Sequence, residues 1–224
     1  MTRDIKGANA DWYQSGYRKC YYSGALGVVY RTVHRVMESR YKENDVFPTI
    51  LEVGAGNGEH FAFIKSQFEK YIMSDIDISG LRPFVDKPNV EVRMLDCADL
   101  KEFKDGSIDR VIATCLLVHV EKPFESLREW RRVVVKGGNL TFYVALEPAW
   151  ILRIIRRLFI WPKSRSLGAE NPEILAYSEH KNHYPAMRAY IKDIFKNDSI
   201  KRVRYPFLLP WNFAFFDIYH ITKE

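Results

Sequence analysis

The 224-residue sequence predicts an α/β fold with a mostly parallel sheet that helices cover on both faces. Three observations predict this fold. From residue 49 onward, short β-rich stretches alternate with helical stretches. A glycine turn, "GAGNG" at 54–58, directly follows the first of these strands. Close to the C-terminus, two strand-like stretches follow one another, which indicates a terminal antiparallel pair.

Five strands are expected in the first part of the sheet, with helices between them. The strand sequences are "TILEV" (49–53), "KYIMSD" (70–75), "VEVRML" (90–95), "DRVIAT" (109–114) and "NLTFYVAL" (139–146). In "GEHFAFIKSQF" (58–68), Phe61, Ile64 and Phe68 share one face, which predicts a helix. "FESLREWRRVVV" (124–135) is a second predicted helix, which Gly137 and Gly138 would end as a C-cap.

The remaining elements flank this core within a single predicted domain. Helical spacing predicts a helix in "ALGVVYRTVHRVMESRY" (25–41) and another in "YPAMRAYIKDIF" (184–195). "SIKRVRYPF" (199–207) and "FAFFDIYHI" (213–221) are the terminal strand pair. The expected parts are an N-terminal helical cap (1–47), a cofactor-binding core (48–146), an insertion or lid (147–182), and a last helix with the terminal strands (183–224).

Composition limits the class of protein. Hydrophobic residues make up 47% and charged residues 28%, which is ordinary for a globular domain and argues against disorder. The formal net charge is +6, which favours acidic partners only weakly. The three cysteines form no C-x-x-C pair, so neither a disulfide framework nor a zinc site is expected. The N-terminus lacks the apolar core of a signal peptide, and no apolar run could span a bilayer, which predicts a cytoplasmic protein.

The glycine turn raises the question of its ligand. A dinucleotide-binding turn requires G-x-G-x-x-G, and the third glycine would fall at position 59, which is Glu59. Glu52 precedes the turn at the end of the strand and could meet an ammonium group. The start of the predicted helix after Gly58 suits a phosphate or a carboxylate. An amino-acid moiety satisfies both ends.

Two acidic residues extend this interpretation to a nucleoside. Asp75 ends the second strand, where a carboxylate can accept hydrogen bonds from both ribose hydroxyls. Asp77 competes with Asp75 for this role, and Asp75 is preferred. Asp96, followed by Cys97, ends the third strand, where an acceptor can bind the exocyclic amine of adenine. An amino acid, a ribose and an adenine together describe S-adenosylmethionine (SAM).

Residues 49 to 146 resemble the class I SAM-dependent methyltransferases, particularly those similar to ubiquinone-biosynthesis C-methyltransferases. The matching pieces are "ILEVGAGNGEH", "YIMSDIDISGL", "VRMLDCADLKEF", "DGSIDRVIATCLLVHVEKPFESLREWRRVVVKGG" and "LTFYV". The resemblance implies a Rossmann-like, doubly wound seven-stranded sheet whose last strand is antiparallel. It also implies SAM as the cofactor and S-adenosylhomocysteine as its product. One departure is "VKGG" (135–138), where the family commonly has Lys-Pro-Gly-Gly.

The resemblance also assigns the cofactor-binding residues. It places Glu52, Gly54, Gly56 and Gly58 at the methionine end, Asp75 at the ribose, Asp96 and Cys97 beside the adenine, and Thr114 and Cys115 nearby after strand four, and it counts Ile76 among the cofactor-binding residues.

Four residues are candidates for chemistry on the acceptor. His119 in "LLVHV" is either a base or a packed histidine, and Glu147 is either an acceptor-facing acid or a solvated loop residue. His180 and His183 in "EHKNHYPAM" suit a general base for a hydroxyl acceptor, or belong to a helix N-terminus without a catalytic role. Their spacing would also suit a metal, but no clear third ligand is present, so no metal site is expected.

The segment "WILRIIRRLFIWPKSR" (150–165) is basic and apolar at once. Arg153, Arg156 and Arg157 share one helical stripe, and no acid occurs between Trp150 and Gly168. Such a helix serves as a lid over the acceptor site, or lies at an anionic membrane surface with its arginines on phosphates. The sequence therefore leaves peripheral membrane contact open.

The expected function is methyl transfer from SAM to a small or lipid-linked acceptor, with a sugar hydroxyl in glycan biosynthesis preferred. Phospholipid or amine N-methylation is the first alternative, and a non-catalytic SAM-binding regulator is an alternative of another class. A nucleic-acid substrate is not expected, because "ATCLLVH" (113–119) lacks the Asn/Asp-Pro-Pro-aromatic motif of the enzymes that methylate nucleic-acid amines. The sequence does not predict the oligomeric state.

Overall fold

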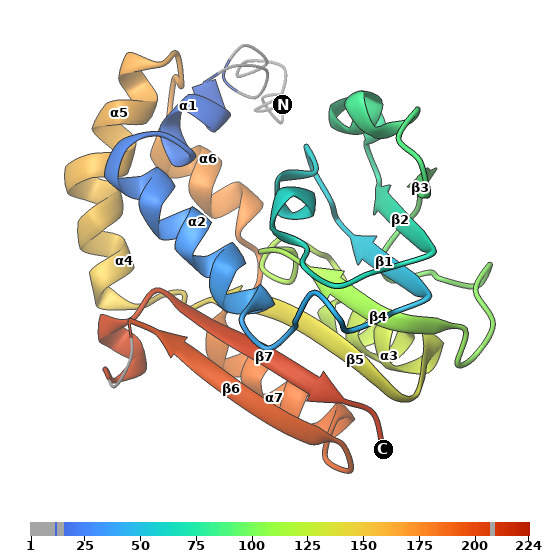
Figure 1. The fold of residues 1–224 in the computed structure, drawn as a ribbon. Coiled ribbons are helices and arrows are strands. Elements are labelled where there is room, and N and C mark those ends of the chain that lie inside the picture. Colours follow the sequence, from blue (N-terminus) through green and yellow to red (C-terminus); the bar gives the residue numbers. More distant parts are fainter. Residues whose placement is uncertain (1–11, 13–15, 207–208) are drawn as a thin grey trace.

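A seven-stranded sheet forms the centre of the computed structural model, which describes residue 12, residues 16–206 and residues 209–224 (Figure 1). The strand order is β3-β2-β1-β4-β5-β7-β6. The first five strands pair in parallel, and β7 is antiparallel to both β5 and β6, as predicted. The strands are β1 (Thr49–Val53), β2 (Lys70–Asp75), β3 (Val90–Met94), β4 (Ile108–Ala113), β5 (Val134–Ala145), β6 (Ser199–Tyr205) and β7 (Phe216–Thr222).

Helices cover both faces of this sheet. On one face α3 (Pro123–Val133) and α7 (Tyr184–Ile194) pack together, and α3 also packs on β5. On the other face α2 (Gly24–Glu38) crosses β5 and β7 (Figure 1). Shorter elements are α1 (Tyr17–Tyr21), η3 (Glu59–Phe63), η4 (Ile78–Phe84) and η6 (Trp211–Phe213).

The helix predicted over residues 58–68 is wrong. Only the five-residue 3₁₀ helix η3 forms, and the backbone at Ile64 is already extended. Gln67 instead makes an isolated parallel bridge with Val46. This path brings the Phe61 and Phe68 rings against Tyr71 of β2, at centroid distances of 5.1 and 5.3 Å. Aromatic packing on the sheet therefore replaces the second half of the predicted helix.

The predicted glycine C-cap at Gly137 and Gly138 is also wrong. Helix α3 ends at Val133, and β5 begins at the next residue. β5 then bulges, because Ile108 pairs with Val134 and Arg110 pairs with Asn139. Gly137 has a φ of +79°, which glycine adopts readily, so it serves the bulge and not the end of the helix.

The insertion after β5 folds into a nearly continuous helix followed by α6 (Pro172–Glu179). The long helix comprises α4 (Trp150–Ile155), the π-helical segment η5 (Arg156–Ile160) and α5 (Trp161–Ser166). It lies beside α1 and α2 (Figure 1). A small second core joins the insertion to the N-terminal part through Trp12, Cys20, Ile160, Ala169 and Leu175. Within the residues described, no helix combines the length and the apolar character needed to cross a bilayer.

A buried charge network ties α2 to the sheet. Glu38 at the end of α2 and Arg110 of β4 are both fully buried and form a two-pronged ion pair, with one N–O distance of 3.0 Å. His60 of η3 donates from Nε2 to Glu38 at 3.0 Å, and its Nδ1 lies 2.9 Å from His34 Nδ1. The Arg110 guanidinium lies 3.6 Å from the centre of the Tyr41 ring. Burial would raise the pKa of Glu38, but His60 and Arg110 outweigh burial and lower that pKa to about 2.

Arg110→Met should destabilise the fold strongly, because it leaves the Glu38 carboxylate buried without its cation. We expect the free energy of unfolding in urea to fall by about 3–5 kcal/mol. The double variant Glu38→Met, Arg110→Met removes both charges and should recover most of that loss. A double variant no more stable than Arg110→Met would contradict the interpretation.

Stability should also fall on mild acidification. Burial lowers the pKa of His34 to about 3 and that of His220 to about 4. An unfolded histidine binds its proton near pH 6.5, so below that pH the unfolded state holds more protons and is favoured. By pH 5 each histidine should cost about 2 kcal/mol relative to pH 7. The check is unfolding in urea at both pH values, and His220→Phe should reduce the difference; an unchanged difference would refute this assignment.

Candidate functional site

The glycine turn follows β1 at the carboxyl end of the sheet. Gly54, Gly56 and Gly58 have φ values of +64°, +57° and +72°. A Cβ on Gly54 would lie 2.5 Å from the Leu116 side chain, and a Cβ on Gly58 would lie 2.5 Å from the Phe84 ring. A Cβ on Gly56 would meet nothing within 4 Å. Packing thus requires glycine at the outer two positions, while the middle one presents bare backbone on an open side.

The expected use of a helix N-terminus beside this turn needs correction. A five-residue 3₁₀ helix has few aligned peptide dipoles, so it offers a carboxylate much less than the predicted helix would. The Gly56 N–H is also already engaged, since it donates to Asp75 Oδ2 at 2.9 Å. The turn therefore offers a carboxylate only a weak helix dipole, and the Gly56 N–H is already used by Asp75.

Glu52 provides the observation that tests the fit to SAM. The side chain is fully buried, and its Oε2 accepts a hydrogen bond from the Tyr71 hydroxyl at 2.8 Å. Its other oxygen, Oε1, is buried and has no hydrogen-bond partner within the described part of the chain. Burial raises the pKa of this carboxyl group. An unsatisfied buried acceptor next to the open turn fits a cationic donor such as an ammonium group.

The ends of β2 and β3 carry the residues expected at the nucleoside. Asp75 is half-buried, and its Oδ1 accepts from the Asp77 N–H at 3.1 Å. Asp77 itself caps η4 by accepting from the Ser79 N–H at 2.9 Å. Ile76 between them is 72% exposed, which leaves an apolar side chain open at the end of the sheet. This geometry favours Asp75 over Asp77 for the ribose, although the assignment stays a prediction.

Asp96 and Cys97 differ in their exposure to solvent. Asp96 is exposed, and its Oδ1 accepts from the Ala98 N–H at 2.8 Å. Cys97 is buried, with its Sγ 3.6 Å from Ser126 Oγ, and burial raises its pKa to about 11. Asp96 is therefore available to a ligand through Oδ2, whereas the Cys97 side chain belongs to the packing below it.

A second group of residues gathers beyond the end of β4. Thr114 and Cys115 are half-buried, and Cys115 has a φ of +52°, which is rare for a residue with a side chain. Burial raises the pKa of the Cys115 thiol to about 12, so this thiol stays protonated near neutral pH. Cys115 influences the pKa values of five tyrosines from α1, the turn after α1, α2 and β5: Tyr17, Tyr21, Tyr22, Tyr30 and Tyr143.

The first four of these rings contact one another. The centroid distance is 4.8 Å between Tyr17 and Tyr21, and 5.6 Å from Tyr30 to both Tyr21 and Tyr22. Burial raises the pKa of each, so they remain neutral hydroxyls. We call Tyr17, Tyr21, Tyr22, Tyr30 and Tyr143 the tyrosine cluster. Its aromatic surface suits an apolar acceptor.

Glu147 forms a buried ionic group beside this cluster. It is 4% exposed, and its carboxylate accepts from Arg156 in a two-pronged pair, with one N–O distance of 2.9 Å, and contacts His180 Nδ1. Burial would raise the pKa of Glu147, but His180 and Arg156 lower it to about 2. Glu147 is therefore an ionised, buried residue, and its interpretation as a solvated loop acid is wrong.

The two other histidines occupy different places. His119 packs edge-on against His180, with ring centroids 4.8 Å apart, and burial together with His180 lowers its pKa to about 4. His119 is therefore neutral at physiological pH. His183 is exposed and is the residue directly before α7. Of the four catalytic candidates, the fold brings His119, Glu147 and His180 together.

Arg156 is the residue whose place the sequence interpretation missed. Helical spacing predicts that Arg156 shares a membrane-facing stripe with Arg153 and Arg157, but of the three only Arg153 and Arg157 are exposed. Arg156 turns inward, at the point where the helix becomes π-helical. A signal was present in the sequence, because Glu147 is the nearest acid before a segment with five cations. The tyrosine cluster had a weaker signal, the tyrosine-rich N-terminal region.

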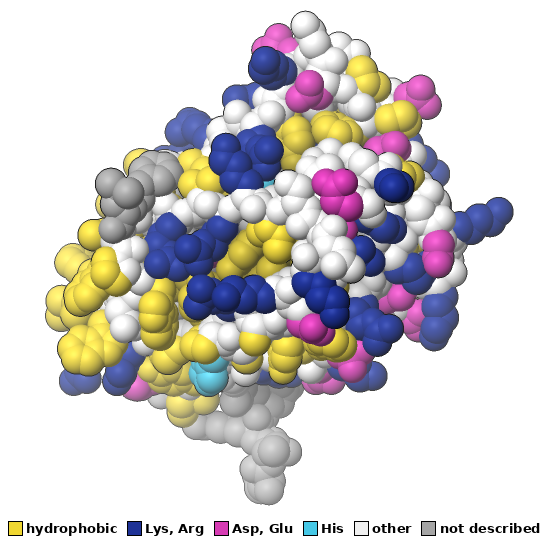
Figure 2. Space-filling view, turned by 90° about the horizontal axis from the view of Figure 1, so that it is seen from below, with side chains coloured by type: hydrophobic (Ala, Val, Ile, Leu, Met, Phe, Trp, Pro, Cys, Tyr) yellow, Lys and Arg dark blue, Asp and Glu magenta, His cyan; other side chains and the backbone are white. Residues whose placement is uncertain are grey.

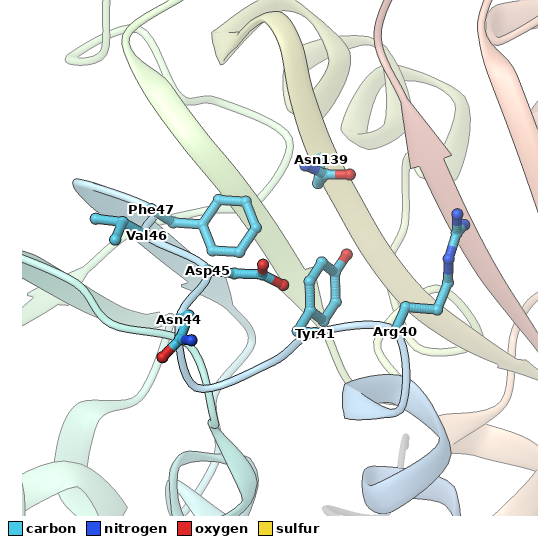
Figure 3. A pocket seen from close by; sticks show the side chains of 7 residues that line it. All are labelled: Arg40, Tyr41, Asn44, Asp45, Val46, Phe47 and Asn139. Atoms are coloured by element: carbon cyan, nitrogen blue, oxygen red, sulfur yellow. The ribbon is translucent and has the colours of Figure 1, made fainter.

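A polar pocket of about 500 Å³ lies elsewhere, between the end of α2, the loop before β1 and the start of β5 (Figure 3). Tyr41, Asp45 and Asn139 are among its lining residues, and Asp45 accepts a hydrogen bond from the Lys42 N–H. This is the amino end of β1, whereas ligands of such sheets bind at the carboxyl ends. The candidate site is therefore the carboxyl end, with the glycine turn and the Glu147 group.

Comparison with known proteins identifies the domain that carries this site. Residues 51–142 match the model of the methyltransferase domain family. A Homo sapiens protein named thiol S-methyltransferase TMT1B is 28% identical over 151 residues, which are 56% of this chain and 58% of that protein. The chain thus matches only about three fifths of that relative's length.

Solved structures share the fold over nearly the whole chain. A SAM-dependent methyltransferase from Thermotoga maritima superposes with a TM-score of 0.63 at 15% identity, covering 96% of this chain and 99% of that one. The CurJ carbon methyltransferase gives a TM-score of 0.64 at 14% identity, covering 97% and 60%. The matched residues 51–142, the strand order and the glycine turn together indicate a methyltransferase domain with the class I SAM-dependent fold.

Proposed function

We propose that the protein transfers a methyl group from SAM to the sulfur of a small apolar thiol. The observation that carries this proposal is the buried Glu147–His180 contact beside the tyrosine cluster. It supplies a base and an aromatic surface at the same end of the sheet as the glycine turn. The similarity to a protein named thiol S-methyltransferase supports a sulfur acceptor.

The cofactor would be held at the ends of the first three strands. Glu52 Oε1 would accept from its ammonium group, and the bare backbone at Gly56 would let it approach the turn. Asp75 would accept from the ribose hydroxyls, with Ile76 against one face of the adenine and Asp96 near its amine. When bound, SAM supplies an electrophilic methyl group, so the protein has to position the acceptor and exclude water.

His180 would remove the proton of the thiol. We assign the Nδ1 proton of His180 to the Glu147 carboxylate, which can only accept, although Arg156 Nη2 also lies 2.9 Å from Nδ1; Nε2 is then the acceptor of the neutral ring. Glu147 fixes this tautomer and stabilises the imidazolium that forms, while Arg156 balances the carboxylate charge. A thiol loses its proton much more readily than a sugar hydroxyl, so one histidine is a sufficient base.

The alternative acceptors, a sugar hydroxyl and an amine, fit the base and the tyrosine cluster less well than a thiol does. A sugar hydroxyl stays a prediction, and it would need more polar partners than an aromatic cluster provides. An amine acceptor, as in phospholipid N-methylation, needs only a neutral lone pair and gives the Glu147–His180 contact no catalytic purpose. A SAM-binding regulator would bind the cofactor and transfer nothing.

Asp75→Asn tests the cofactor assignment. Losing charged hydrogen bonds to the ribose should weaken SAM binding by about 10- to 100-fold in isothermal titration calorimetry. Asp77→Asn is the matched control, because Asp77 caps η4 and should affect affinity little. Circular dichroism of both variants confirms the fold, since Asp75 also accepts from Gly56. Unchanged affinity in a folded Asp75→Asn protein would refute the assignment.

The acceptor and the base are tested together with methyl-labelled SAM. An alkyl thiol should become labelled, and the alcohol of the same chain length should not. His180→Asn should lower kcat for the thiol by about 10²- to 10⁴-fold while SAM affinity stays unchanged. His183→Asn is the control for the second histidine of the motif and should leave kcat unchanged. A loss of activity in His183→Asn would mean that His183, and not His180, is the base. SAM binding without transfer to any acceptor would favour the regulator.

A further inference from the structure

The long helix of the insertion exposes an apolar face that the proposed chemistry does not use. Trp150, Ile154, Leu158 and Phe159 are 65%, 50%, 61% and 63% exposed, and we call them the apolar face. The first three are spaced four residues apart, so they form one stripe along the helix. The opposite side of the helix is already packed, through the half-buried Ile151, Leu152 and Ile155. An apolar stripe of this kind on a folded domain indicates an interaction surface.

The stripe continues onto a neighbouring element. The short helix η6 packs against α4, and Phe213 of η6 is 53% exposed. Figure 2 shows hydrophobic side chains gathered at the left edge, on the side where Figure 1 places α4 and α5. Lys and Arg side chains lie next to them in the same view. The surface therefore combines apolar and basic character.

The charge around the apolar face indicates which kind of partner docks on it. The exposed Arg153 and Arg157 flank the stripe, and the helix segment from Trp150 to Gly168 contains no acid that could offset them. A second copy of the chain would place its own Arg153 and Arg157 against this positive surface, which costs energy. An anionic lipid surface satisfies both requirements, because acyl chains cover the stripe and phosphates meet the arginines.

We propose that the apolar face, with Arg153 and Arg157, docks on anionic lipid bilayers and that the acceptor is an apolar thiol dissolved in them. The second clause rests on the proposed function. The insertion helix has an inner and an outer side. Arg156 on the inner side binds Glu147, and the apolar face on the outer side is exposed. Docking thus brings the lipid phase to within one helix of the Glu147–His180 group and the tyrosine cluster. The acceptor would need little transfer through water.

The docking is tested by flotation with vesicles. Wild-type protein should float with phosphatidylcholine vesicles that contain phosphatidylglycerol, less with phosphatidylcholine alone, and less as salt increases. Ile154→Gln, Leu158→Gln should weaken partitioning roughly tenfold or more, because both side chains would enter the interface. Val85→Gln, Met94→Gln is the matched control, since these residues are 58% and 69% exposed after η4 and at the end of the edge strand β3, outside the insertion helix. Arg153→Gln, Arg157→Gln should remove the preference for phosphatidylglycerol.

Three outcomes would overturn docking. The wild type fails to float at low salt, the Ile154→Gln, Leu158→Gln variant floats as well as the wild type, or light scattering finds a dimer that this variant dissociates. The acceptor clause has its own measurement. Wild type should methylate a long-chain thiol carried in vesicles several-fold faster than the variant, and both should methylate a short water-soluble thiol equally. Equal rates on the vesicle thiol overturn that clause; no transfer to any thiol overturns the proposed function and leaves the flotation result standing.

Discussion

The buried ion pair between Glu38 and Arg110 is the constraint on which the site depends. Two charges removed from water are tolerated only when each is fully paired, so α2 has little freedom to shift along the sheet. His60 joins the same carboxylate and fixes the segment that follows the glycine turn. α2 also carries Tyr30 of the tyrosine cluster. One interaction at the end of a helix therefore places parts of both the cofactor side and the acceptor side.

The cofactor side differs from the simplest account of an anion-binding turn. η3 is too short for a strong helix dipole, and the Gly56 N–H donates to Asp75. In the proposed function, binding relies on a buried acidic group, Glu52, whose second oxygen has no hydrogen-bond partner among the described residues. Such an oxygen is costly when unsatisfied, so a cationic ligand would gain free energy by satisfying it. The proposed preference for an ammonium group rests on this asymmetry and not on the turn alone.

The acceptor side is built by segments that are far apart in the sequence. Glu147 follows β5, Arg156 comes from the insertion helix, and His180 ends α6. The π-helical segment shifts the register, so that Ile160 is buried while Phe159 is exposed. The same helix thereby provides an ionic group inside and an apolar face outside. This arrangement gives a single structural reason for its unusual composition.

The sequence by itself determined the strands, the terminal antiparallel pair, the glycine turn and the acidic residues at or just beyond the ends of β1, β2 and β3. These features are local, because a strand buried between neighbours needs an apolar stretch and a tight turn needs glycine wherever they occur. Only the tertiary structure decided that residues 64–68 leave the helix, that Arg156 separates from Arg153 and Arg157, and that Glu147 is ionised and buried. Each of these depends on a partner in another element of the fold: the Tyr71 ring of β2, Glu147 after β5, and the side chains of Arg156 and His180. Periodicity carries no record of such partners, because a contact between elements is selected by the packed fold and not by the spacing of residues along one element.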